Sequence, residues 1–62
     1  MKKIIQPKQF LDIKEASIFL SVKESWLRSQ VFKDEIPFIK MGRQVRFDKY
    51  DLLKWIDENK NK

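Results

Sequence analysis

The sequence is poor in the side chains that usually carry out catalysis or hold a metal. It contains no His and no Cys, so the commonest general base and both the imidazole and the thiolate ligand are missing. A single Gly cannot form a Gly-rich phosphate loop. The carboxylates that could act in pairs lie where helices are expected to begin, and there they serve as caps. They are Asp12, Glu15, Asp48 and Asp51. We therefore expect no enzymatic activity, metal site, cofactor or small-molecule ligand.

Basic side chains are the chemistry that the sequence does offer. Fourteen Lys and Arg oppose nine Asp and Glu, which gives a formal net charge of +5 and a pI near 9.7. A small basic domain commonly meets a polyanion, although a Lys-rich composition can also serve solubility alone. The candidate contacts form two groups. The first is Lys23, Ser25, Trp26, Arg28 and Ser29, and the second is Lys40, Arg43, Gln44 and Arg46.

Each group also has an interpretation that needs no ligand. Glu24 is near enough in the sequence to pair with either cation of the first group. In the second group, Arg43 and Arg46 can be solvated, or one of them can pair with Asp48. Trp26 either fills the edge of a core or is exposed, where it can stack on a base or anchor a protein partner. These alternatives stay open at the level of sequence.

The length of the chain limits its organisation. Sixty-two residues form one small domain. No apolar run approaches the ~20 residues of a membrane helix, and the opening residues lack the apolar stretch of a signal peptide. We expect a cytoplasmic, nucleoid-associated protein, and the Lys- and Ile-rich composition favours a bacterial or phage source. The sequence predicts an extended arm over residues 1–10, a domain over 11–57 and a basic tail over 58–62 that frays.

Two short helices follow the arm. Asp12 and Glu15 form the pattern of a capping box, and apolar residues at helical spacing then continue to Leu20. The second helix is expected over Lys23–Phe32, with Leu27 in its buried stripe and its polar residues facing outward. Two short helices joined by a few residues are typical of a helix-turn-helix, although any pair of short helices gives a similar pattern.

The apolar spacing then changes from helical to alternating. Residues 36–41 and 44–47 are β-prone runs on either side of the only Gly, which predicts a hairpin with Arg43 at its tip. Ile39 and Met41 are expected on one face of this hairpin. A final helix is expected after Asp48, with an apolar side made by Tyr50 or Leu52, Leu53, Trp55 and Ile56.

Several motifs now occur in a recognisable order: Leu11-Asp12-Ile13-Lys14-Glu15-Ala16, Leu20, Val22, Leu27, Val31, Ile36-Pro37, Met41-Gly42-Arg43, Arg46-Phe47, Asp51-Leu52 and Trp55-Ile56. This set, which covers residues 11–57, resembles the excisionase-like, MerR-related winged helix-turn-helix DNA-binding domains. The resemblance implies a mainly α fold of three helices with a two-stranded β-hairpin wing. It also implies that the second helix enters the major groove of DNA and that the wing lies on the backbone or minor groove.

In functional terms, the resemblance implies a non-enzymatic factor of a mobile element or phage that binds duplex DNA, either an excisionase-like architectural factor or a small regulator. The chain departs from the family pattern at Lys23, where a capping Ser is usual, and at Trp26, Gln30 and Asp34. Ser21 or water must then cap the second helix.

A second hypothesis treats the domain as an accessory subunit. It would bind a larger replication enzyme encoded nearby, such as a polymerase, primase or helicase, and hold DNA for it without sequence specificity. Seven Phe and Trp residues are many for so small a core, and those left outside would mark a protein-partner surface, with a recombinase or a replication enzyme of the same element as the partner. The candidates are Phe32, Phe38 and Trp55. Repression through a homodimer is a weaker alternative, because no long coiled-coil helix follows the domain.

Overall fold

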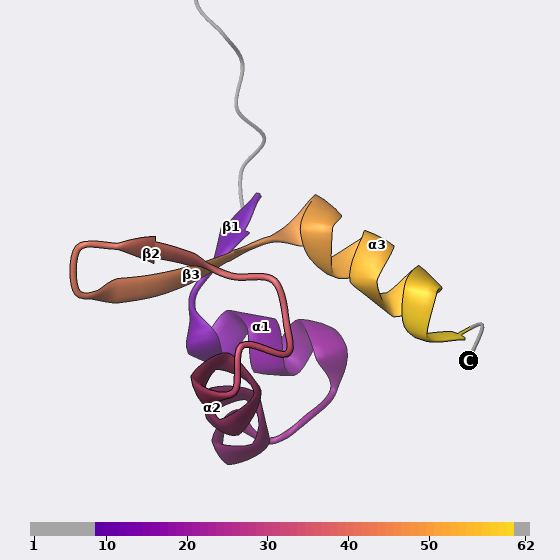
Figure 1. The fold of residues 1–62 in the computed structure, drawn as a ribbon, viewed down its shortest axis with the longest axis horizontal. Helices are drawn as coiled ribbons and strands as arrows, with labels where there is room; N and C mark the ends of the chain where they lie inside the picture. The colour runs from indigo at the N-terminus through magenta and orange to yellow at the C-terminus, as the bar shows by residue number, and fades with distance from the viewer. Residues whose placement is uncertain (1–8, 61–62) are drawn as a thin grey trace, which may run out of the picture.

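A computed structural model describes residues 9–60 of the chain. Its elements follow in the order β1 (Phe10–Leu11), α1 (Ile13–Leu20), α2 (Glu24–Phe32), β2 (Ile39–Met41), β3 (Gln44–Asp48) and α3 (Lys49–Lys60). Figure 1 shows α1 and α2 below the sheet, the β2–β3 hairpin extending to one side and α3 to the other. This arrangement confirms the prediction of a mainly helical fold with three helices and a hairpin, and it is compatible with a winged helix-turn-helix.

The sheet has one strand more than the sequence predicts. Its order is β1-β3-β2, and both strand pairs are antiparallel. Leu11 pairs with Phe47, and the backbone N–H of Lys49 donates to the carbonyl of Gln9 at 2.8 Å. A strand of two residues is too short to show alternation, so the sequence pattern does not reveal β1. The rest of the predicted arm, residues 1–8, lies outside the described residues.

The two hairpin strands differ in length from the prediction: β2 is shorter, and β3 extends one residue further, to Asp48. The strand expected over 36–41 begins only at Ile39, because Ile36 leaves the strand direction to fill the core. Ile39 pairs with Arg46, and Met41 pairs with Gln44. Ile39 and Met41 therefore lie on the same face of the hairpin, as predicted, although Met41 is 48% exposed and this face is not buried near the turn. The turn end of the hairpin therefore lies beyond the core and is exposed to solvent.

One core connects all these elements. Almost every element contributes one buried side chain, and the loop before β2 contributes another; they are Leu11, Ala16, Leu27, Ile36, Phe47 and Leu52. Phe47 is fully buried on β3, the middle strand, where it pairs with the buried Leu11 of β1. The helices and the hairpin therefore hold their relative positions through a small number of side chains.

Helix ends follow the predicted signals in two places and differ in one. The capping box of α1 is complete: the Asp12 carboxylate accepts from the Glu15 amide at 2.7 Å, and the Glu15 carboxylate accepts from the Asp12 amide at 3.0 Å. Before α3, the Asp48 carboxylate accepts from the Tyr50 amide at 2.9 Å. The basic tail, for which the sequence predicts fraying, is helical as far as Lys60, where a cation complements the negative helix end. Residues 61–62 lie outside the described part.

Candidate nucleic-acid interface

The turn between α1 and α2 sets the direction of α2. Ser21 ends α1 in the left-handed conformation, with φ of 59°, and the Val22 amide donates back to the Ser17 carbonyl at 2.9 Å. Leu27 then fixes α2 to the core. The residue before α2 is Lys23, whose side chain makes no capping hydrogen bond. The expectation that Ser21 caps α2 is not met, because this residue closes the preceding helix.

The hairpin consists of β2, the two-residue turn Gly42–Arg43 and β3, and we call it the wing, after the element that the sequence analysis predicted at this position. Gly42 has φ of +63°, a conformation that costs Gly little, and Arg43 follows it at the tip. A positive φ at the first of two turn residues matches the right-handed twist of the paired strands. The hairpin therefore projects Arg43 into solvent, where it is exposed.

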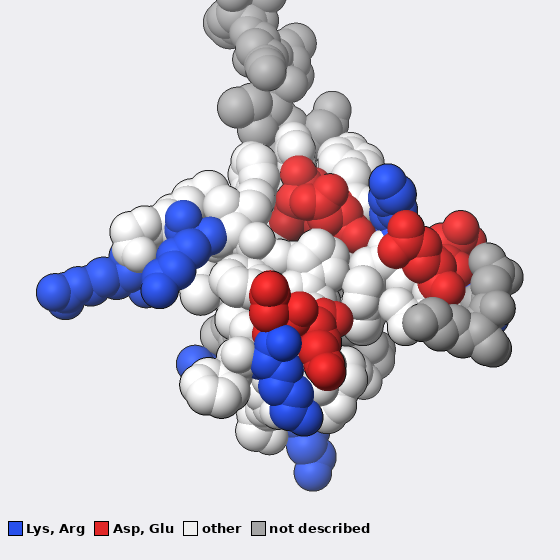
Figure 2. Space-filling model, viewed as in Figure 1, with Lys and Arg blue, Asp and Glu red and all other residues white. Residues whose placement is uncertain are grey.

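A groove of about 510 Å³ separates α2 from the wing, and we call it the α2–wing groove. It is lined by Asp12, Ile13, Lys14, Arg28, Val31, Phe32, Arg43, Gln44, Val45 and Arg46. It brings together one predicted contact of α2, Arg28, with three of the wing. The remaining predicted contacts lie outside the groove and are Lys23, Ser25, Trp26, Ser29 and Lys40. In Figure 2, Lys and Arg side chains extend from the hairpin at the left, whereas Asp and Glu side chains lie at the centre and the right of this view, with further Lys and Arg side chains among them.

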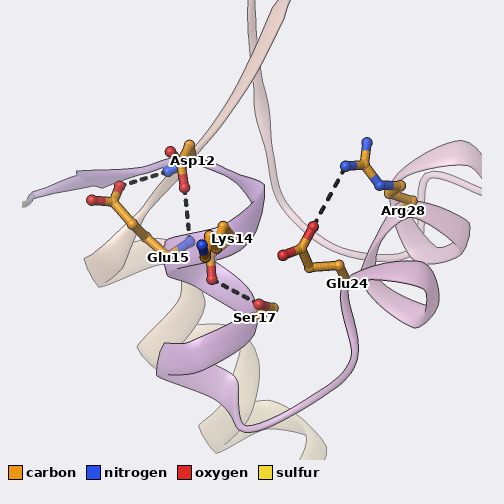
Figure 3. A network of polar contacts seen from close by, with 6 residues as sticks. All are labelled: Asp12, Lys14, Glu15, Ser17, Glu24 and Arg28. Atoms are coloured by element: carbon orange, nitrogen blue, oxygen red, sulfur yellow. Dashed lines mark hydrogen bonds and ion pairs between the residues drawn. The ribbon is translucent and has the colours of Figure 1, made fainter.

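The three guanidinium groups of the groove are held differently. Arg28 lies 3.6 Å from the carboxylate of Glu24, one of the two pairings left open by the sequence (Figure 3). Arg46 donates to the Val45 carbonyl at 2.8 Å and to the side-chain oxygen of Gln44. In the described part of the chain Arg46 makes no ion pair with Asp48, and Arg43 has no ionic partner. Among the three arginines of the groove, Arg43 is therefore the one most available to a ligand.

The aromatic candidates divide into exposed and core-bound residues. Trp26 is 41% exposed and is not among the residues packed against the buried core, which favours the exposed one of the two interpretations left open by the sequence. Phe32, at the end of α2, is 91% exposed. Phe38 and Trp55, by contrast, are half-buried against the core. Of the three residues suggested as a protein-partner surface, only Phe32 is presented almost entirely to solvent.

The apolar floor of the groove and its α1 side are features that sequence reasoning misses. The sequence pattern marks Ile13, Val31 and Val45 only as core positions, and it gives no reason to single out Lys14 as a contact. The proximity of α1 to the wing is a tertiary feature. No periodicity or motif in either segment could have revealed it.

Residues 9–60 contain neither a candidate metal site nor a membrane-spanning helix. No group of three or more His, Cys, Asp or Glu in this part of the chain could hold a metal ion. No helix among the same residues is long and apolar enough to cross a membrane.

The comparison with protein families shows to which family the chain belongs. The model of the helix-turn-helix domain matches residues 10–60, nearly the whole chain. The chain belongs to the helix-turn-helix family. The helix-turn-helix domain is a DNA-binding unit, so DNA is its partner, as the sequence analysis predicted. Neither the curated proteins nor the solved structures include a match to the chain.

Proposed function

We propose that this helix-turn-helix protein binds duplex DNA as a non-enzymatic factor of a bacterial mobile element or phage, working as an excisionase-like architectural factor or a small regulator. In this proposal α2 enters the major groove, and the wing contacts the backbone or the adjacent minor groove. The observation that carries it is the α2–wing groove, where Arg28, Arg43 and Arg46 come from two elements that a duplex could contact together.

The proposal assigns different tasks to the two groups of predicted contacts. Polar residues on α2 face base edges, and the wing cations contact phosphates without reading sequence. Arg43 is exposed at the wing tip, and the exposed Lys40 lies on the neighbouring strand. With about three to five phosphate contacts, log affinity should fall against log salt with a slope near −3 to −4.

Fluorescence anisotropy on labelled duplexes tests this function. The protein is titrated into duplexes from its own genetic locus and into random duplexes, at two salt concentrations and with unlabelled random competitor. Binding to the locus that survives competitor, with the stated salt slope, supports a site-specific factor. Absence of duplex binding at low salt would refute the proposal.

A second candidate function is favoured by one observation, the 91% exposure of Phe32. A bare aromatic ring at the mouth of a groove is unfavourable in water and is a common anchor for a protein partner. We propose, as the alternative, an accessory subunit that binds a larger replication enzyme encoded nearby and holds DNA non-specifically. Co-expression with that enzyme and size-exclusion chromatography test it. Separate elution, together with site-specific duplex binding by the isolated protein, would count against it.

A further inference from the structure

The acidic residue Glu24 is out of place on a helix face proposed to meet DNA. It is the first residue of α2, and its carboxylate lies 3.6 Å from the guanidinium of Arg28, one helical turn further on (Figure 3). The side chains are 42% and 65% exposed, respectively. A pair this exposed contributes little to the stability of the helix. As an acidic residue in the first turn of α2, Glu24 also complements the positive end of the helix dipole, so the carboxylate has a local structural effect beside any effect on DNA contacts.

The carboxylate changes what Arg28 can contact. A phosphate that approaches Arg28 also approaches Glu24, because side chains four residues apart on a helix are neighbours. The negative charge of Glu24 therefore makes a backbone contact at this position less favourable. This penalty is absent at a base edge that offers a hydrogen-bond donor beside its acceptors, because the Glu24 carboxylate can accept from that donor.

One base pair has the matching pattern in the major groove. Guanine presents two adjacent acceptors, N7 and O6, which suit the forked donors of an arginine. Cytosine, paired with it, presents the N4 amino group, a donor that a carboxylate accepts. An A·T pair places its amino donor between two acceptors, so an arginine cannot bind two adjacent acceptors there.

We propose that Glu24 is a specificity-determining residue and that the Glu24–Arg28 pair reads one G·C base pair. Arg28 donates to guanine N7 and O6, and Glu24 accepts from cytosine N4. This inference rests on the proposed function, because it requires α2 in the major groove of a duplex. It assigns to the chain a preference at one base-pair position and an acidic residue that discourages non-specific binding through Arg28.

The test is selection of binding sites from a pool of random duplexes, followed by anisotropy on the selected site and on the same site with single base pairs replaced. The wild-type chain is compared with Glu24→Gln, which keeps the shape of the side chain and removes its charge. Glu58→Gln is the matched control: it removes the same charge from an exposed position near the end of α3, far along the chain from α2. Circular dichroism melting of each variant checks folding.

The wild-type protein and Glu58→Gln should enrich a site with one G·C pair whose replacement by A·T lowers affinity about tenfold or more. Glu24→Gln should lose part of that discrimination, because Arg28 still favours guanine, while it binds random duplexes at least as tightly as wild type. Retention of the full preference by Glu24→Gln would overturn the inference and leave the proposed function standing. An equal loss of affinity for every duplex would also overturn it, because it would indicate a structural role. Failure of the wild-type chain to bind duplexes at all would refute the proposed function itself, and this inference with it.

Discussion

The two ends of this small domain differ in how their charge is organised. At one end, the α2–wing groove gathers three arginines from α2 and the wing around an apolar floor. At the other end, α3 alternates three lysines with three acidic residues, and the shallower groove beside it is lined by Pro37, Asp51, Lys54, Trp55 and Glu58. The net charge of +5 alone does not indicate which end meets DNA. The comparison shows that the proposed interface is identified by where the fold groups like charges, and not by how many charges the chain carries.

The largest effect should come from removing the residue on which both ends depend. Phe47 is fully buried in the middle strand, so Phe47→Ala leaves a cavity in the only core of the described residues. The expected loss is about 3–5 kcal/mol of unfolding free energy. A domain of this size has little stability beyond that, so the variant should be largely unfolded at 25 °C. Urea denaturation followed by circular dichroism measures it, and a native-like midpoint would show that the two ends are stabilised separately.

The next largest effect, on DNA affinity, should distinguish the α2–wing groove from the α3 end of the domain. Replacing Arg43 and Arg46 with Ala should weaken binding to every duplex. It should also flatten the slope of log affinity against log salt by about 0.9 for each phosphate that the variant no longer neutralises. The matched control, Lys54→Ala with Lys60→Ala, removes the same charge from α3. Anisotropy at several salt concentrations compares the two double variants. Equal reductions in affinity would mean that net charge alone drives binding and that the groove has no special role.

Within the wing pair, Arg43 should account for more of that reduction than Arg46. Arg43 has no ionic partner among the described residues, whereas Arg46 already donates to the Val45 carbonyl and to the side-chain oxygen of Gln44, so fewer of its donors are available to a phosphate. The single variants, measured by the same anisotropy titrations, separate these contributions. A larger effect from Arg46→Ala would show that the tip of the wing is not its main point of contact.

A smaller effect should follow from a change in the wing that leaves its charge intact. Gly42 has φ of +63°, and a Cβ added there would meet nothing within 4 Å. The cost of Gly42→Ala is therefore backbone strain alone, about 1–2 kcal/mol at this residue. We expect weaker DNA binding through a misdirected Arg43, with the helices unaffected. Backbone amide chemical shifts that change throughout α1 and α2 would contradict this local account.

Sequence reasoning predicts those features of the structure that are determined by residues near one another in the chain. The capping box of Asp12 and Glu15, the left-handed turn at Gly42 and the burial of Leu27 all follow from neighbouring residues. The parts that it misses depend on distant pairing. Strand β1 exists only because β3 lies beside it, and the floor of the groove exists only because α1 approaches the wing. For the same reason, the sequence could not show which of the predicted contacts the fold gathers in one groove.

The smallest expected effect on stability belongs to Phe32, and for that reason its replacement is informative. A side chain that is 91% exposed packs against almost nothing, so Phe32→Ser should change the unfolding free energy by less than about 0.5 kcal/mol. If the chain binds DNA alone, duplex affinity should also change little, since the arginines of the groove remain. If it is an accessory subunit, the same variant should lose its complex with the larger enzyme while its DNA affinity and melting curve stay unchanged. The wild type and Phe32→Ser are therefore compared by thermal melting, anisotropy and size-exclusion chromatography. The comparison shows whether the groove contacts DNA alone or whether the ring of Phe32 also contacts a second protein.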